Sequence, residues 1–109
     1  MIDYSTLINK YPNFFAKLPF GIECGKGWYE ILDELIGKII ALQPDAQASQ
    51  IKEKYGELRV YMMSATDEVL DLIDEYTEKS LRTCEVCGKP GELYDDGWLK
   101  TRCEEHKDD

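Results

Sequence analysis

The chain has 109 residues, of which 43% are hydrophobic and 11% aromatic, and its formal net charge is −9. This composition excludes a disordered chain, and the length suits one compact domain. No apolar run approaches the roughly 20 residues that cross a bilayer, and the N-terminus lacks a basic segment followed by an apolar one, so we expect a cytoplasmic protein without a membrane partner.

The first half of the chain predicts two helices. Apolar residues recur at the spacing of one helical face between residues 4 and 11, and Pro12 ends that segment. Residues 14–20 are rich in aromatic side chains and predict an irregular cover over the core. Between residues 28 and 40 the apolar side chains again share one face, which predicts the central helix, and Pro44 ends it.

A β-hairpin and a third helix are predicted next. Apolar and polar residues alternate near the end of segment 51–63, and Gly56 lies where a tight turn requires a positive φ. Thr66 can cap a helix that extends to about Leu81. We therefore predict an α+β body over residues 1–81, with helices packed on a β-hairpin.

The last quarter of the chain predicts a metal site. Cys84 and Cys87 are separated by two residues, as are Cys103 and His106, and fifteen residues lie between the pairs. This spacing is typical of two knuckles that meet on one tetrahedral ion, and the Cys3His set favours zinc over iron. We predict one structural zinc ion.

A zinc ribbon is the predicted fold of this part. Residues 92–94 and 98–101 predict strands joined by a turn at 95–97, so the ribbon spans residues 82–109 and is appended to the same compact unit. Trp98 is expected to shield one side of the metal, since an aromatic ring helps a small core exclude water. The alternative is that Trp98 contacts a partner.

The sequence does not predict an enzyme. Three cysteines and one histidine fill a zinc tetrahedron, whereas a catalytic zinc keeps an open position. With His106 on the metal no free imidazole remains, and no nucleophile motif or phosphate loop is present, so we expect no small-molecule substrate. Cys24 is interpreted as a partly buried thiol, with a reactive thiol as the alternative.

Negative charge is concentrated in the second half of the chain, where residues 64–109 carry a net charge of −8 and residues 1–63 only −1. Five acidic residues share one side of the third predicted helix; they are Asp67, Asp71, Asp74, Glu75 and Glu78. They are either a solvated face that keeps the protein soluble or a docking surface for a basic protein partner. Such a field repels nucleic acid.

Nucleic-acid binding is the alternative function, because zinc ribbons often bind nucleic acid. The bases on or near the predicted ribbon are few and outnumbered by acids; they are Arg82, Lys89, Lys100 and Arg102. We therefore consider nucleic acid the less favoured partner.

Several segments resemble a family of small uncharacterised proteins from phages, prophages and their bacterial hosts. The resemblance lies in residues 27–32, 51–61 and 65–69 and in the two halves of the metal motif, Cys84 to Gly88 and Cys103 to His106. It implies a cytosolic, phage-associated setting and no established activity. We therefore expect a non-enzymatic zinc-containing interaction module, such as a phage-encoded inhibitor or adaptor that binds a host protein complex, for example a defence system.

Overall fold

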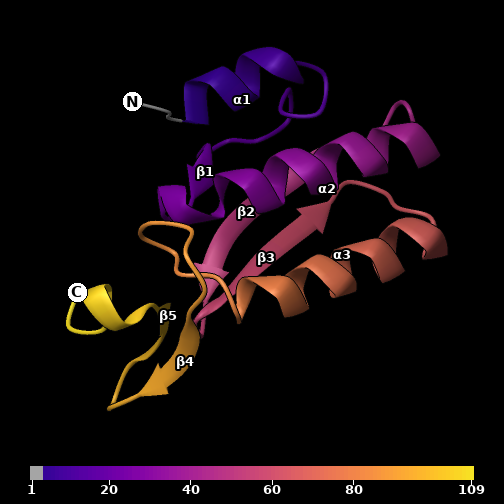
Figure 1. Cartoon of the computed structure of the whole chain (residues 1–109). Coiled ribbons are helices and arrows are strands. Elements are labelled where there is room, and N and C mark those ends of the chain that lie inside the picture. The colour runs from indigo at the N-terminus through magenta and orange to yellow at the C-terminus, as the bar shows by residue number, and fades with distance from the viewer. Residues whose placement is uncertain (1–3) are drawn as a thin grey trace.

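A computed structural model describes residues 4–109 and shows a mixed α/β fold with two small sheets (Figure 1). In chain order, the helices are α1 (Tyr4–Lys10), α2 (Tyr29–Leu42) and α3 (Asp67–Ser80), and two 3-10 turns are η1 (Lys26–Trp28) and η2 (Glu104–His106). The strands are β1 (Ile22–Glu23), β2 (Ala48–Lys54), β3 (Glu57–Met62), β4 (Glu92–Asp95) and β5 (Leu99–Arg102). The three helices and both hairpins were predicted from the sequence.

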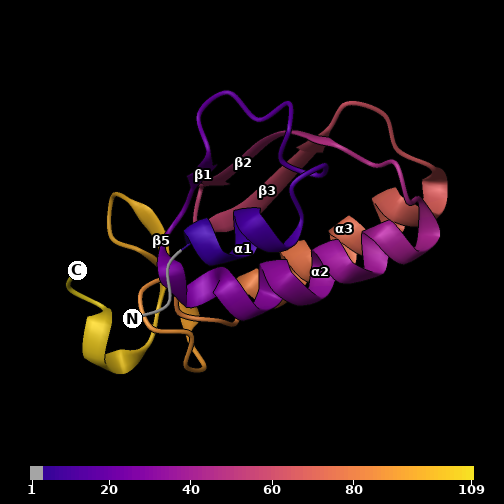
Figure 2. The same ribbon diagram turned by 90° about the horizontal axis from the view of Figure 1, so that it is seen from above.

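The main sheet has the strand order β1-β2-β3, with β1 parallel to β2 and β2 antiparallel to β3. Helices α2 and α3 lie side by side over one face of this sheet, and α1 lies beside α2 (Figures 1 and 2). The core fills the space between the helices and the sheet, because the apolar side of each element is buried there. The β4–β5 hairpin extends beyond the C-terminal end of α3 (Figure 1).

The β2–β3 turn confirms the role predicted for Gly56. Tyr55 and Gly56 form a two-residue loop, and both have positive φ values, 55° and 83°. A type I′ hairpin requires this at both central positions, and glycine adopts it without strain. The turn fixes the register that places Leu58 opposite Glu53.

Helix α3 begins as predicted. The Thr66 hydroxyl accepts a hydrogen bond from the Val69 N–H at 3.2 Å, which satisfies one of the free donors of the first turn. Val69 and Ile73 are buried, so the apolar side of α3 packs against the core. None of the helices in the described part of the chain has the length and hydrophobicity that a membrane crossing requires.

Three details differ from the sequence prediction. The two-residue strand β1 was not predicted, because its pairing with β2 depends on residues far away in the chain and leaves no local pattern. Strand β2 begins at Ala48, before the segment 51–63 in which the hairpin was predicted. Phe20, expected in the aromatic cover, is 75% exposed, whereas Phe14 is buried.

Candidate metal centre

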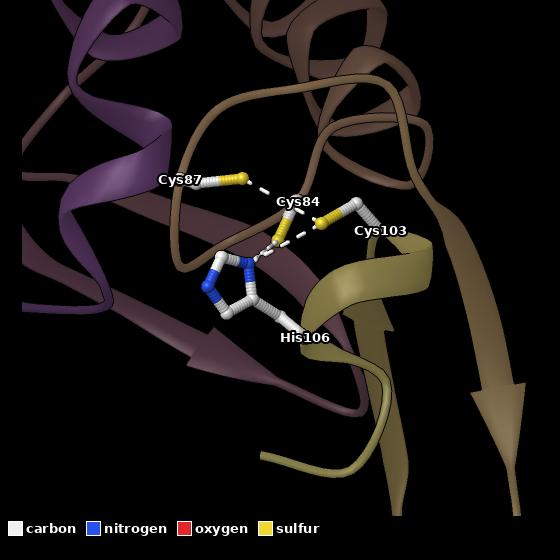
Figure 3. A group of neighbouring side chains, drawn as sticks. All are labelled: Cys84, Cys87, Cys103 and His106. Carbon is white, nitrogen blue, oxygen red and sulfur yellow. Dashed lines mark hydrogen bonds between the residues drawn. The ribbon is translucent and has the colours of Figure 1, made fainter.

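Cys84, Cys87, Cys103 and His106 come together at one point, as the spacing predicted (Figure 3). Their ligand atoms all lie within 4.8 Å of one another. His106 Nδ1 lies 3.8 Å from Cys84 Sγ and 3.3 Å from Cys103 Sγ, and the sulfurs of Cys87 and Cys103 are 3.6 Å apart. The four residues therefore form a Cys3His cluster with free thiols.

These distances fit a tetrahedral metal ion. Zinc bonds of about 2.3 Å to sulfur and 2.0 Å to nitrogen imply sulfur–sulfur distances of about 3.8 Å and sulfur–nitrogen distances of about 3.5 Å around a tetrahedron. Three pairs of ligand atoms, at 3.3 to 3.8 Å, lie close to these values, and all the ligand atoms lie within 4.8 Å of one another. A disulfide would require sulfurs in bonding contact, about 2.0 Å apart. The cluster could hold one ion with no protein ligand missing.

The two ligand pairs are held by different local structures. The first pair lies on a tight turn, in which the Gly88 N–H donates to the Cys84 carbonyl at 2.9 Å and Gly88 has a φ of 82°. The second pair uses η2, with Cys103 just before this turn and His106 at its end. The sequence predicted two knuckles, but the second pair lies on a 3-10 turn, and Glu104 and Glu105 favour this helical geometry.

The electrostatics of the cluster favour a cation. Burial alone would raise the pKa of the Cys84 thiol, but backbone N–H groups of Cys103 and two neighbouring residues lower it to about 6. At Cys87 the Lys89 backbone N–H favours the thiolate, but desolvation and the adjacent sulfurs outweigh it, so the pKa of this thiol is raised. A divalent cation would remove this repulsion between thiolates and hold all three cysteines ionised.

Glu85, between the first two cysteines, joins the metal loop to the segment before α2. Its carboxylate accepts a hydrogen bond from the Gly25 N–H at 2.8 Å and pairs with Arg102 at 3.0 Å. Its carbonyl accepts a hydrogen bond from the Gly27 N–H at 2.7 Å. The two side chains of the ion pair are only 12% and 15% exposed. Sequence reasoning missed this contact.

Gly25 and Gly27 allow this close approach. A Cβ at Gly25 would lie 2.9 Å from Glu85 Cγ, and one at Gly27 would lie 2.6 Å from the carbonyl of Glu85. No side chain tolerates such distances to a fixed backbone, so only glycine fits at Gly27. The Gly-Lys-Gly motif before Trp28 was the one sequence signal of this contact.

Two further hydrogen bonds hold the metal-binding segment on the body. Trp28 is fully buried, and its indole N–H donates to the carbonyl of Thr83, the residue before Cys84, at 2.9 Å. The buried Thr101 hydroxyl donates to the carbonyl of Gly56 at 2.6 Å. The metal site is therefore built on the body of the protein, although the predicted boundary between residues 81 and 82 stays a prediction.

Trp98 does not shield the metal, and that expectation is wrong. Its side chain is 73% exposed. It lines a cavity of about 530 Å³ together with Lys52, Lys54, Tyr55 and Leu99. The reason is that Trp98 lies just before β5, at the turn end of the hairpin, whereas the ligands lie at its other end. Trp98 stays a candidate partner contact, but its surface does not include α3.

Five of the six acidic residues of α3, namely Asp67, Asp71, Asp74, Glu75 and Glu78, were predicted to share one side of the helix, and all five are exposed. We call them the acidic face. Within residues 4–109, only Glu78 among them forms an ion pair, with Arg82 at 3.1 Å. Leu70, 47% exposed, lies beside Asp74 on the same helix. The face is therefore open to solvent and largely unneutralised.

Cys24 lies outside the cluster and is half-buried. Burial raises the pKa of its thiol to about 12, although a hydrogen bond with Tyr4 favours the thiolate. A thiol with so high a pKa is a weak nucleophile near neutral pH, which agrees with the interpretation as a partly buried, unreactive cysteine.

Comparison with known proteins finds no matching family model, curated protein or solved structure.

Proposed function

We propose that this protein is a non-enzymatic interaction module, stabilised by one structural zinc ion, that binds a basic protein surface through the acidic face. The metal is assigned as zinc because a complete Cys3His tetrahedron suits zinc and leaves no open position for catalysis. The hairpin between the ligand pairs supports the finer assignment of a zinc ribbon.

The observation that carries this proposal is that all five acids of the acidic face are exposed along one helix. Like charges four residues apart oppose helix formation by a few tenths of a kcal/mol per pair. Asp67 and Asp71 are such a pair, as are Asp71 and Glu75, and neither pair has a cation partner within the described chain. Binding a basic surface would compensate this cost.

Nucleic-acid binding is less well supported. Of the four bases near the hairpin, Arg82 pairs with Glu78 at 3.1 Å and Lys89 with Glu105 at 3.1 Å. The other two are also engaged, since Arg102 pairs with Glu85 at 3.0 Å and Lys100 donates to the Asp109 carbonyl at 3.3 Å. Little positive charge is left for phosphates.

The resemblance to phage and prophage proteins supports a setting in the bacterial cytoplasm. In that setting the partner would be a host protein complex, such as a defence system, and the protein would act as an inhibitor or adaptor. This part of the proposal rests on the resemblance alone.

The test is a tagged pull-down from bacterial host lysate treated with nuclease. The native chain is compared with a variant in which Asp71, Asp74, Glu75 and Glu78 are changed to lysine. The matched control changes four exposed acids elsewhere to lysine and so has the same net charge; they are Glu92, Asp95, Asp96 and Asp108. A protein retained by the native chain and the control, but lost with the first variant, is the expected result. Retention by all three chains would refute the proposal.

A further inference from the structure

A groove lies between α3 and β3, directly beside the acidic face. It has a volume of about 230 Å³ and is lined by Val60 and Tyr61 of β3 and by Leu70, Ile73 and Asp74 of α3. Val60 and Ile73 are buried and form its floor. We call this feature the α3–β3 groove.

The rim of the groove exposes apolar surface. Leu70 is 47% exposed and Tyr61 40%. Met63, two residues beyond Tyr61 along the chain, is 59% exposed. Grouped apolar exposure next to polar residues is typical of interaction sites, because covering such surface releases water and lowers the free energy.

The charge around the groove is negative on the helix side. Asp74 lines the groove. Asp67 lies three residues before Leu70 in the sequence, and Asp71 directly follows Leu70. On the strand side Arg59 pairs with Glu57 at 3.3 Å, so that wall is close to neutral. An occupant that fits must therefore combine an apolar group with positive charge.

The size and position of the groove favour a polypeptide. Small-molecule pockets enclose roughly 300–1,000 Å³, and this groove is smaller, so it suits one or two side chains. It follows β3, which is the outer strand of the sheet. At one end of β3, the N–H of Leu58 donates to the Ser80 hydroxyl at 3.0 Å and its carbonyl accepts from Thr77 at 3.2 Å. These two bonds occupy the main-chain groups of Leu58, so a bound peptide would contact the side chains of the groove rather than extend the sheet at this end.

We propose that the α3–β3 groove binds a peptide segment of the partner in which one apolar side chain is flanked by lysine or arginine. The apolar side chain enters between Tyr61 and Leu70, and the basic side chains pair with Asp67, Asp71 and Asp74. This inference rests on the proposed function and names the chemistry of the partner.

The test uses a displayed library of random 12-residue peptides, selected on the zinc-loaded full chain. We expect the selected peptides to share one apolar residue with lysine or arginine close by. Leu70→Ser should weaken the best peptide about tenfold or more, because it removes a contact at the centre of the interface. The matched control is Leu93→Ser on β4, since Leu93 is 44% exposed. It should bind within about twofold of the native chain.

Peptides without a basic residue or without an apolar one would overturn the inference, as would equal binding by the Leu70→Ser chain. Self-association of the native chain that is lost in Leu70→Ser would also overturn it, because the groove would then hold a second copy. A lysate partner that is lost on reversal of the acidic face but kept by Leu70→Ser would leave the proposed function standing and refute the groove alone. Circular dichroism and zinc content of each variant establish that it is folded.

Discussion

Two glutamate–arginine pairs in this protein occupy opposite environments. Glu85 and Arg102 are only 12% and 15% exposed, whereas Glu78 and Arg82 are 65% and 64% exposed. Water screens the exposed pair, but it does not reach the buried one to the same extent. The buried carboxylate also accepts the N–H of Gly25. The two pairs therefore allow a matched comparison.

Glu85→Ala should lower the free energy of unfolding by about 3–5 kcal/mol, because Arg102 would be left largely buried without its carboxylate and with only the Thr101 carbonyl as acceptor. Glu78→Ala should change it by less than about 0.5 kcal/mol. Urea denaturation of both variants, with zinc in excess, measures the difference. Equal losses in the two variants would show that Glu85 is no anchor of the metal loop.

Single residues also show what the sequence could predict. The four metal ligands and Gly56 were predicted because their chemistry depends on spacing along the chain and on local turns. The contact between Gly25 and Glu85 joins residues 60 positions apart, and the Gly-Lys-Gly motif alone does not show which segment packs against it. Trp98 was misplaced for a different reason: it lies beside the predicted turn at 95–97, at the end of the hairpin away from the ligands, and the shielding role did not take this position into account.

At the scale of elements, two glycines differ in how closely their neighbours approach: Gly27 lies in η1, just before α2, and Gly37 lies inside α2. Gly27 lies against the backbone of Cys84 and Glu85, which cannot move without displacing the metal loop. At Gly37, inside the helix, a Cβ would lie 3.3 Å from the hydroxyl at the end of the Tyr11 side chain, which can shift. The first glycine is required by packing, and the second is not.

Gly27→Ala should therefore cost about 1–3 kcal/mol or more, because the added Cβ overlaps a fixed backbone. Gly37→Ala should be neutral or stabilise by up to about 1 kcal/mol, since alanine is the better helix former. Thermal unfolding of both variants provides the measurement. A Gly27→Ala chain as stable as the native one would contradict the close packing of the metal loop on η1.

The helices could be predicted because their apolar periodicity is contained within each segment. Strand β1 could not, because two residues carry no period and its parallel partner β2 follows only after all of α2. The spacing of the second ligand pair predicted a knuckle, but the 3-10 turn η2 holds this pair. Local signals thus predicted the elements, and tertiary pairing decided the remaining details.

For the whole molecule, the contacts of Trp28, Glu85 and Thr101 join the metal segment to the body. Removal of the metal should therefore destabilise the entire fold, because repulsion between thiolates would loosen the loop against which α2 begins. Ligand binding to the folded state alone raises stability in proportion to the logarithm of ligand concentration.

A chelator should lower the midpoint of thermal unfolding by about 10 °C or more, since each kcal/mol shifts it by roughly 4–8 °C in a chain of this size. Circular dichroism follows the transition, and native mass spectrometry should show one zinc ion per chain. Cys24→Ser should retain the metal, and Cys103→Ser should lose it. An unchanged midpoint with the chelator, or no bound metal, would contradict a structural zinc ion.

The hydrogen bond from Trp28 to Thr83 has an optical consequence. Trp28 is fully buried, and its indole N–H donates to Thr83, the residue before the ligand Cys84. Trp98 is 73% exposed and lies at the turn of the β4–β5 hairpin. Indole fluorescence shifts to longer wavelength when water reaches the ring, so the two tryptophans emit differently. In a Trp98→Phe chain all tryptophan emission comes from Trp28. A change in its emission would therefore report metal binding at the neighbouring site without any added label.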